Sequence, residues 1–254
     1  MKTKTSQGIR IKSSNEVDIL RKAGKILSSI VIQLQSSLTS GMSTKDIDLK
    51  AEELVRQNKV TAAFKGYHSF PGVACISVNE VVVHGIPDKR IIKNGDIVSL
   101  DMGIIYKGYY SDTAVTVPVG DVSPEIRRLL DVTRASLFRG IGQARAGNRL
   151  SDISFAVQSF VEMHGFSVVR DFVGHGIGRQ LHEEPEIPNY GQPSQGPVLQ
   201  EGMVFSIEPM VNMGTHRTKT LSDGWTVVTE DGKPSAHFEH SIVITSKGPE
   251  ILTQ

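Results

Sequence analysis

Four acidic residues stand beside hydrophobic runs that are typical of β-strands. Asp101 ends one such run and Asp112 begins the next, while Glu208 ends a third run and Glu239 begins a fourth. Aspartate and glutamate are poor strand formers and are costly to bury without a partner. One acid at a strand end would be explained by a turn cap or an ion pair. Four acids at matched positions, two in each half, instead indicate a divalent cation that turns their mutual repulsion into attraction.

A histidine flanked by glycines supplies a fifth candidate ligand. His175 lies in the run Gly-His-Gly-Ile-Gly at 174–178, where small neighbours let a backbone approach closely and leave an imidazole nitrogen accessible to a metal. The glycine spacing differs from that of a dinucleotide-binding loop, and no acid follows about twenty residues later. The run 182–186 does not match the zinc-binding HExxH helix, because its fifth residue is Glu and Pro185 intervenes. One imidazole with four carboxylates suits Mn, Fe(II) or Co better than a closed structural zinc site.

The elements that must position these residues begin with helices. Ser13 and Glu16 have the spacing of a capping box, and apolar residues then recur at helical intervals as far as Leu34. Gly41 interrupts this pattern. The sequence next predicts a second helix and then strands, at 44–57, 73–83, 96–101 and 113–117, with a hairpin turn at 107–110.

The same order of elements starts again in the second half. Ser123 followed by Pro124 is typical of a helix start, and this helix is predicted to continue to about Arg145. Ser151 is interpreted as the cap of a further helix that ends at Gly165. Strands and turns fill the remainder, so each half is predicted to contain two helices followed by strands.

Residue matches at a nearly constant spacing indicate that the two halves are related. Short matches between segments with similar elements can arise by chance, but three matches in register favour an internal duplication with a shared centre. The predicted organisation is a short tail over 1–12 and one domain over 13–254, with halves at about 13–120 and 121–254. The three pairs, 106 or 107 residues apart, are Gly41 with Gly147, Asp101 with Glu208, and His68 with His175.

Composition excludes several classes of protein. The 254 residues include 28 Lys+Arg and 27 Asp+Glu, so no broad basic surface for DNA is expected. A single cysteine excludes an internal disulfide framework and a cysteine-only zinc site. No apolar run is long enough to span a bilayer, and the first residues lack the apolar core of a signal peptide. We therefore expect a cytoplasmic globular protein with no membrane partner.

Taken together, the candidate residues resemble those of type I methionine aminopeptidases. The likeness covers nearly the whole chain, and it implies the pseudo-twofold pita-bread fold of the creatinase and aminopeptidase enzymes. That fold is an α/β fold of the α+β type, with helices packed on a mostly antiparallel sheet. The family's five-ligand dimetal site is similar to the set Asp101, Asp112, His175, Glu208 and Glu239, and further motifs match at 84–87, 174–178, 182–185, 206–209 and 238–240.

The resemblance also implies how the metal ligands would work. Asp112 and Glu239 would bridge two divalent ions, for which Co, Mn, Fe(II) and Zn are the candidates. Asp101 would complete one ion's ligands, and His175 and Glu208 those of the other. A water molecule between two cations loses a proton easily and becomes the nucleophile at neutral pH. Glu208 would act as general base and then as acid toward the leaving amine.

Two histidines outside this set are implied to be catalytic and substrate-binding. His84 and His182 are expected on turns, where the resemblance places His84 near the scissile amide and His182 at the developing oxyanion. By contrast, we interpret His164, His216 and His237 as ordinary solvated loop histidines.

The resemblance further implies an apolar and shallow pocket for the methionine side chain. Phe70 stands where relatives often have tyrosine, and Leu181 where many have an aromatic residue, so the wall stays apolar but differs in shape. Cys75 is not expected to be a nucleophile, because the sequence places no base for it. The implied lining residues are Phe64, Tyr67, Phe70, Cys75, Leu181 and Trp225.

The predicted reaction is removal of the N-terminal methionine from nascent chains whose second residue is small and uncharged. The protein would keep its own Met1, because Lys2 is too long for such a selective pocket. We expect a monomer. Basic residues near the start could contact a ribosome transiently through its RNA, but a solvated tail is the simpler interpretation of Lys2, Lys4, Arg10 and Lys12.

Three alternatives stay open at this point. A binding module that kept the fold would be supported by the loss of a metal ligand, and none is lost. Prolidases and X-Pro aminopeptidases share the metal centre but generally carry an additional N-terminal domain, and only about sixteen residues precede the first helix here. Type II methionine aminopeptidases have a helical insertion in the second half, for which this chain has no room.

Overall fold

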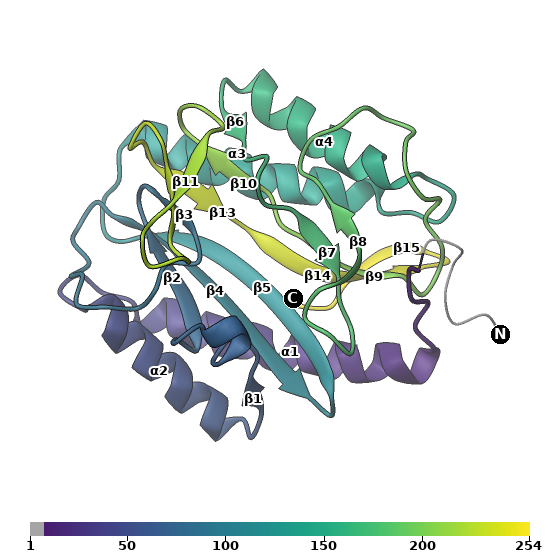
Figure 1. Ribbon diagram of the computed structural model, residues 1–254, viewed down its shortest axis with the longest axis horizontal. Helices are drawn as coiled ribbons and strands as arrows, with labels where there is room; N and C mark the ends of the chain where they lie inside the picture. The colour runs from purple at the N-terminus through teal and green to yellow at the C-terminus, as the bar shows by residue number, and fades with distance from the viewer. Residues whose placement is uncertain (1–7) are drawn as a thin grey trace.

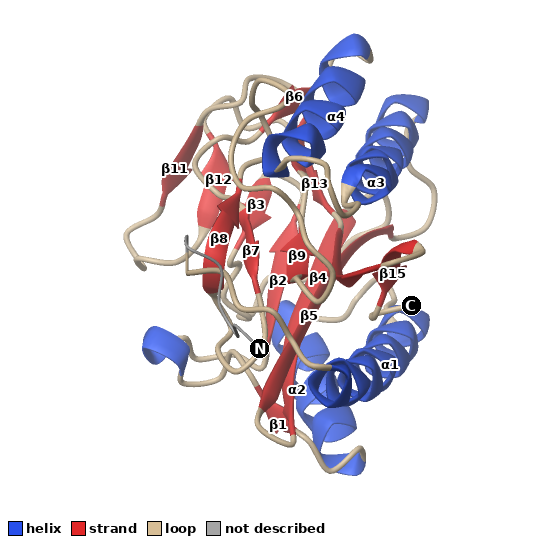
Figure 2. Ribbon diagram, turned by 90° about the vertical axis from the view of Figure 1, so that its right-hand side faces the viewer, coloured by secondary structure: helices blue, strands red, loops and turns tan. Residues whose placement is uncertain are grey.

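The structure, a computed structural model, describes residues 8–254. Its α-helices form two pairs, and both pairs cover the same face of a large sheet (Figure 2). One apolar core lies under each pair. No helix among the described residues is long and apolar enough to cross a membrane. The pairs are α1 (Ser14–Ser37) with α2 (Thr44–Gln57), and α3 (Pro124–Gln143) with α4 (Leu150–Met163).

Local sequence explains where the helices begin. The predicted capping box of α1 is present: the Ser13 backbone donates to the Glu16 carboxylate at 2.9 Å, and the Glu16 backbone donates to the Ser13 hydroxyl at 3.4 Å. At α4 the prediction is wrong, because Arg149 is the N-cap and Ser151 lies inside the first turn. The Ser151 hydroxyl donates instead to the carbonyl of Gln195 at 3.0 Å, which ties the helix to a loop.

Within residues 8–254 the main sheet has nine strands, and every strand pair in it is antiparallel. Its order is β1-β4-β5-β14-β9-β7-β8, with β2 also paired to β4 and β15 to β14 (Figure 1). Two small sheets stand beside it, β13-β10-β6 and β11-β12-β3. The strands are β1 (Thr61–Ala62), β2 (Ala74–Val78), β3 (Val81–Val83), β4 (Ile97–Tyr106), β5 (Tyr109–Pro118), β6 (Ser167–Val168), β7 (Gly174–Gly176), β8 (Glu183–Ile187), β9 (Val204–Ile207), β10 (Met210–Asn212), β11 (Thr218–Thr220), β12 (Val227–Thr229), β13 (Ser235–His237), β14 (Glu239–Thr245) and β15 (Gly248–Ile251).

The β4–β5 hairpin is longer than the sequence predicts. Its turn is only Lys107 and Gly108, which adopt positive φ angles of 50° and 77°. Asp101 and Asp112 therefore lie inside their strands, and the prediction that they mark strand ends is wrong. The threonines, valines and tyrosines around them have high strand propensity, which outweighs the acids. The acids of the second half do lie at strand ends as predicted, Glu208 after β9 and Glu239 at the start of β14.

Hydrogen bonds at the centre of the sheet repeat with twofold symmetry. The Thr116 hydroxyl donates to the carbonyl of His237 at 2.8 Å and accepts from its N–H at 2.8 Å. In the same way, the Ser241 hydroxyl donates to the carbonyl of Asp112 at 2.8 Å and accepts from its N–H at 3.2 Å. This repeat agrees with the predicted pseudo-twofold fold. Each hydroxyl also meets a serine of the neighbouring strand, Ser99 at 2.8 Å and Ser206 at 3.3 Å.

This symmetry changes which residues correspond between the halves. It relates Asp112 to His237 and not to Glu239, so only one acid pair occupies matched positions. The predicted match between His68 and His175 is also wrong. His68 lies in the short helix η1 (Tyr67–Ser69), outside the main sheet, whereas His175 lies in β7.

The described part of the predicted tail packs against the rest of the chain. Ile9 is buried in the core under α3 and α4. The Lys12 ammonium forms an ion pair with Glu183, so its interpretation as part of a solvated tail is wrong. Lys2 and Lys4 lie outside the described residues.

Candidate metal centre

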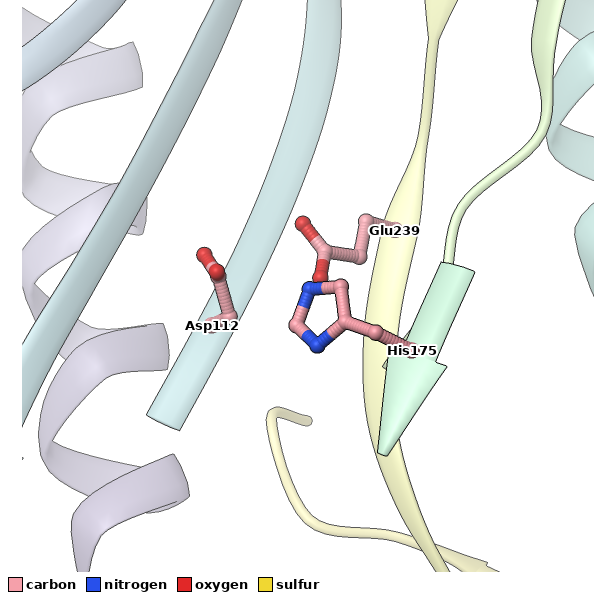
Figure 3. Close-up of side chains that lie close together, drawn as sticks. All are labelled: Asp112, His175 and Glu239. Carbon is pink, nitrogen blue, oxygen red and sulfur yellow. The ribbon is translucent and has the colours of Figure 1, made fainter. Parts of the chain in front are cut away.

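Three side chains from three strands meet at the middle of the sheet. Asp112 extends from β5, His175 from β7 and Glu239 from β14 (Figure 3). One potential ligand atom of each lies within 4.8 Å of the others, which is close enough for a single metal ion to bind all three. All three side chains are buried.

The orientation of His175 suits a metal ligand. A hydrogen bond of 2.9 Å joins its Nδ1 to the Gly176 carbonyl, so Nδ1 carries the proton and Nε2 keeps a free electron pair. Burial lowers the pKa of His175 to about 3, which keeps the ring neutral. The flanking glycines are required by space. A Cβ at Gly174 would lie 2.4 Å from the Ser206 carbonyl oxygen, and one at Gly176 would lie 2.1 Å from that of Glu184.

Asp101 and Glu208 face the same space from β4 and from the residue after β9. Glu208 Oε1 lies 3.5 Å from His175 Nε2. Burial raises the pKa of Asp101 to about 7. Burial, followed by the charges of Glu239 and Asp101, raises the pKa of Glu208 well above its usual value. All five predicted ligands therefore converge, although only three fall within the tightest cluster.

The remaining two carboxylates are buried and only partly compensated by hydrogen bonds. Asp112 is 4% exposed and Glu239 is 2% exposed, and one oxygen of each has no hydrogen-bond partner among the described residues. Burial and the neighbouring acids raise the pKa of Asp112, and burial and Asp101 raise that of Glu239. Buried carboxylates without donors are costly, and divalent cations remove that cost. The donor set of four carboxylates and one imidazole fits such ions.

The structure adds a residue that the sequence reading missed. His237 is not a solvated loop histidine: it ends β13, is 2% exposed, and its Nε2 lies 3.7 Å from Glu208 Oε2. Burial, with a smaller contribution from His84, lowers the pKa of His237 to about 3. Its position two residues before Glu239 was a usable signal, because alternate residues of an extended chain face the same side.

A cavity of about 700 Å³ opens above the acids. The predicted metal, catalytic and pocket residues all line it. The Cys75 thiol is buried and its pKa is raised, first by burial and then by Asp101, so it lacks the thiolate character of a nucleophile. The cavity also has lining residues that the sequence reading did not identify, among them Val83, Phe172, Val173 and Met210.

The two predicted catalytic histidines both line this cavity. His84 follows β3 with a φ of 59°, and its ring makes edge contacts with Phe172 at 5.4 Å and Trp225 at 5.8 Å between ring centroids. His182 lies in the turn before β8, where its Nδ1 is 2.8 Å from the Tyr67 hydroxyl. Burial lowers the pKa of His84 to about 4 and also lowers that of His182. Both rings are therefore neutral at pH 7.

Comparison with known proteins identifies the family of the chain. Residues 18–246 match metallopeptidase family M24. The methionine aminopeptidase of Clostridium perfringens is 53% identical over 245 residues, which are 96% of this chain and 98% of that one. The solved structure of methionine aminopeptidase from Thermotoga maritima has a TM-score of 0.95 and 46% identity, and covers 97% of this chain and 99% of that chain. A prolidase from Pyrococcus furiosus has a TM-score of 0.78 and 25% identity, and this chain covers 65% of it.

Fold and site together define a metal-dependent peptidase of the pita-bread class, as the sequence predicts. The chain belongs to metallopeptidase family M24 and, within it, to the methionine aminopeptidases. The prolidase likeness reflects the shared fold at lower identity.

Proposed function

We propose that this chain removes the N-terminal methionine from polypeptides whose second residue is small and uncharged. Two divalent ions would be held by Asp101, Asp112, His175, Glu208 and Glu239. The observation that carries the proposal is the set of buried carboxylates with unpartnered oxygens at the floor of the cavity. Bound divalent ions supply the Lewis acidity that makes a water molecule nucleophilic at neutral pH.

Glu208 is the acid best placed to move a proton. Its side chain is 13% exposed, whereas Asp112 and Glu239 are almost fully buried. A carboxylate that reaches both the cavity and its floor can accept a proton from water and return it to the leaving amine. His237 beside it offers a neutral ring nitrogen that can fix the Glu208 carboxylate.

His182 is proposed to stabilise negative charge on the substrate oxygen. Burial raises the pKa of Tyr67, so its hydroxyl stays protonated and can donate to His182 Nδ1. In that tautomer Nε2 carries the hydrogen and can donate to a substrate oxygen. His84, which also lines the cavity, is proposed to contact the scissile amide.

The apolar wall of the cavity is proposed to hold the methionine side chain. Its aromatic part is rigid, because Phe70 and Trp225 pack edge to face with 5.1 Å between ring centroids. A sulfur-containing, unbranched side chain packs favourably against such rings. The proposed wall comprises Phe64, Tyr67, Phe70, Cys75, Leu181 and Trp225.

Other features remain proposals that rest on the sequence. We propose Co, Mn, Fe(II) or Zn as the ions, nascent chains in the cytoplasm as substrates, a monomeric state and a transient ribosome contact. We also propose one catalytic domain with halves at about 13–120 and 121–254. The symmetric hydrogen bonds from β5 to His237 of β13 and to Ser241 of β14 support this division, since they join the two halves at the shared centre.

Peptide cleavage by the metal-free protein, with one metal titrated back at a time, tests the function. A Met-Ala-Ser peptide should release methionine only after Mn or Co is added, and a chelator should abolish the release. Met-Lys-Ser is the matched control, and it should stay intact because lysine is too long for the second position.

Three outcomes would contradict the proposal. Steady cleavage in metal-free buffer would show that the reaction does not require a metal. Binding of Met-Ala-Ser without release of methionine would favour a binding module. Preference for an Ala-Pro dipeptide over Met-Ala-Ser would favour the prolidase alternative.

A further inference from the structure

The turn that carries His182 is held by one carboxylate. We call residues 178–183 the His182 turn. Glu183 Oε1 accepts hydrogen bonds from the backbone N–H groups of Arg179 at 2.8 Å and Gln180 at 3.3 Å. Its second oxygen, Oε2, accepts from the Lys12 ammonium at 2.6 Å. The position of the turn therefore depends on where Lys12 holds that carboxylate.

The Lys12–Glu183 pair is closed off from solvent. Both side chains are 4% exposed. Gly178 leaves room for the pair, because a Cβ at that position would lie 2.5 Å from Lys12 Cε and 2.9 Å from both Lys12 Nζ and Glu183 Oε1. A larger residue at the last glycine of the Gly-His-Gly-Ile-Gly run would thus displace the ion pair, while the first two glycines are required by the backbone of the sheet around His175.

Lys12 is itself fixed from the other side. Its backbone N–H donates to the Gly202 carbonyl at 2.8 Å. Ile9, which precedes Lys12 closely in the sequence, is buried in the core. The first half adds a further bond, since the Tyr110 N–H donates to the Gly178 carbonyl at 2.7 Å. We call residues 9–12 the N-terminal strap, because they join a rigid core to the His182 turn.

The position of the His182 turn determines where His182 lies in the cavity. His182 precedes Glu183 directly, its ring centroid lies 4.4 Å from that of His175, and its Nδ1 contacts the Tyr67 hydroxyl. A small shift of Glu183 would therefore move the donor nitrogen relative to the metal centre. Stability alone does not explain such a pair, because apolar residues of similar volume are often at least as stabilising as a buried ion pair.

We infer that Lys12 is a positioning residue for the reaction: through its ion pair with Glu183, the N-terminal strap sets where His182 stands in the cavity. This inference rests on the proposed function of His182. Lys12 is not among the residues that line the cavity, whereas its partner Glu183 is, so Lys12 acts on the site through that carboxylate.

A double-mutant cycle between Lys12 and His182 tests the inference. Lys12→Met keeps most of the length of the unbranched side chain and removes the charge. It should lower kcat for Met-Ala-Ser by roughly 10- to 100-fold with little change in KM, because a small misplacement of a catalytic group costs this much. In a His182→Ala background the same change should lower kcat by less than about twofold, because the group that Lys12 positions is gone.

A readout without metal or substrate separates this inference from the proposed function. In the metal-free protein, the NMR signals of the His182 ring should shift in Lys12→Met and stay unchanged in Lys50→Met. Lys50 is the matched control, since its ion pair with Glu53 is exposed on α2. If Lys12→Met does not fold, Glu183→Gln keeps an acceptor oxygen, and it should shift the same signals and lower kcat in the same direction.

Two results would overturn the inference. One is an unchanged His182 ring signal in both variants. The other is an equal loss of kcat with and without His182, which would indicate general damage to the fold. If the wild-type protein loaded with Mn or Co releases no methionine, the proposed function fails, and the ring signals alone still decide whether the strap positions His182.

Discussion

Two buried aspartates differ in whether nearby hydrogen-bond donors compensate for the burial of the carboxylate. Asp48 of α2 is 2% exposed, and it accepts hydrogen bonds from the backbone N–H groups of Val73 at 2.7 Å and Ala74 at 3.1 Å and from the Lys45 ammonium at 2.9 Å. Asp112 of β5 is equally buried, yet one of its oxygens has no partner among the described residues, and its neighbours are other acids.

This difference in hydrogen-bond donors indicates that Asp48 stabilises the fold, whereas Asp112 contributes to the metal centre. The donors around Asp48 stabilise its charge and fix the start of β2 against α2. The surroundings of Asp112 disfavour its charge until a cation arrives, so its burial lowers the stability of the metal-free protein. Removal of each carboxylate should therefore have effects of opposite sign.

Asp112→Asn should give the largest effect. Methionine release from Met-Ala-Ser should fall at least about a thousandfold, because several kcal/mol of metal-dependent stabilisation are lost. At pH 8 the metal-free variant should nevertheless resist urea better than the metal-free wild type, since a buried acid repelled by Glu239 and Asp101 is gone. Steady-state kinetics and urea unfolding measure the two effects.

Asp112→Asn can also contradict the distinction between Asp48 and Asp112 most directly. If this variant made the metal-free protein less stable and left methionine release within about tenfold of wild type, Asp112 would be a structural acid like Asp48. Calorimetric titration with Mn adds a direct check, because loss of a ligand should weaken binding of the ion.

Much of the fold and site could be predicted because the signals were local. The Ser13–Glu16 capping box and the apolar stripe after it are read within one helix, and both are present. The fold class is likewise confirmed by the structural neighbours. The glycines around His175 were correctly linked to close backbone approach, since only hydrogen fits beside the neighbouring carbonyls.

The errors arose where one local signal was given too much weight or where contacts distant in the sequence decided burial. Asp101 and Asp112 looked like strand ends because acids are poor strand formers, but the hairpin continues through them. Lys12 looked solvated because its partner, Glu183, is distant in the sequence. His237 was misread because its burial depends on pairing between β13 and β10, which local sequence does not reveal.

The pH dependence of Asp101→Asn should give the next largest effect. Burial raises the Asp101 pKa from 3.8 to about 7, so the folded protein holds a proton that the unfolded chain releases. This group stabilises the fold at low pH, and that stability is lost as pH rises through about 7. The metal-free wild type should therefore lose stability relative to Asp101→Asn between pH 4 and 8, as urea unfolding at several pH values would show.

Wild type and Asp101→Asn contain the same buried histidines, so the difference in their stability reports on Asp101 alone. Those histidines have lowered pKa values and act in the opposite direction. Saturating Mn should reverse the trend, because a cation favours the charged carboxylate. A pH-independent difference between metal-free wild type and Asp101→Asn would show that this acid is compensated in the fold, as Asp48 is.

Asp48→Ala should give the smallest effect of the three, and it should fall on stability. Two backbone N–H groups would lose their acceptor, and Lys45 its partner, so the free energy of unfolding should drop by about 3 kcal/mol. Methionine release per folded molecule should stay within about twofold of wild type, because none of these atoms reaches the cavity. Asp131→Ala, at an exposed site on α3, is the control and should change stability by less than about 0.5 kcal/mol. A loss of activity in fully folded Asp48→Ala would mean that the contact between α2 and β2 also positions the metal ligands, since Cys75 of β2 pairs with Asp101. Asp48 and Asp112 would then no longer represent separate roles.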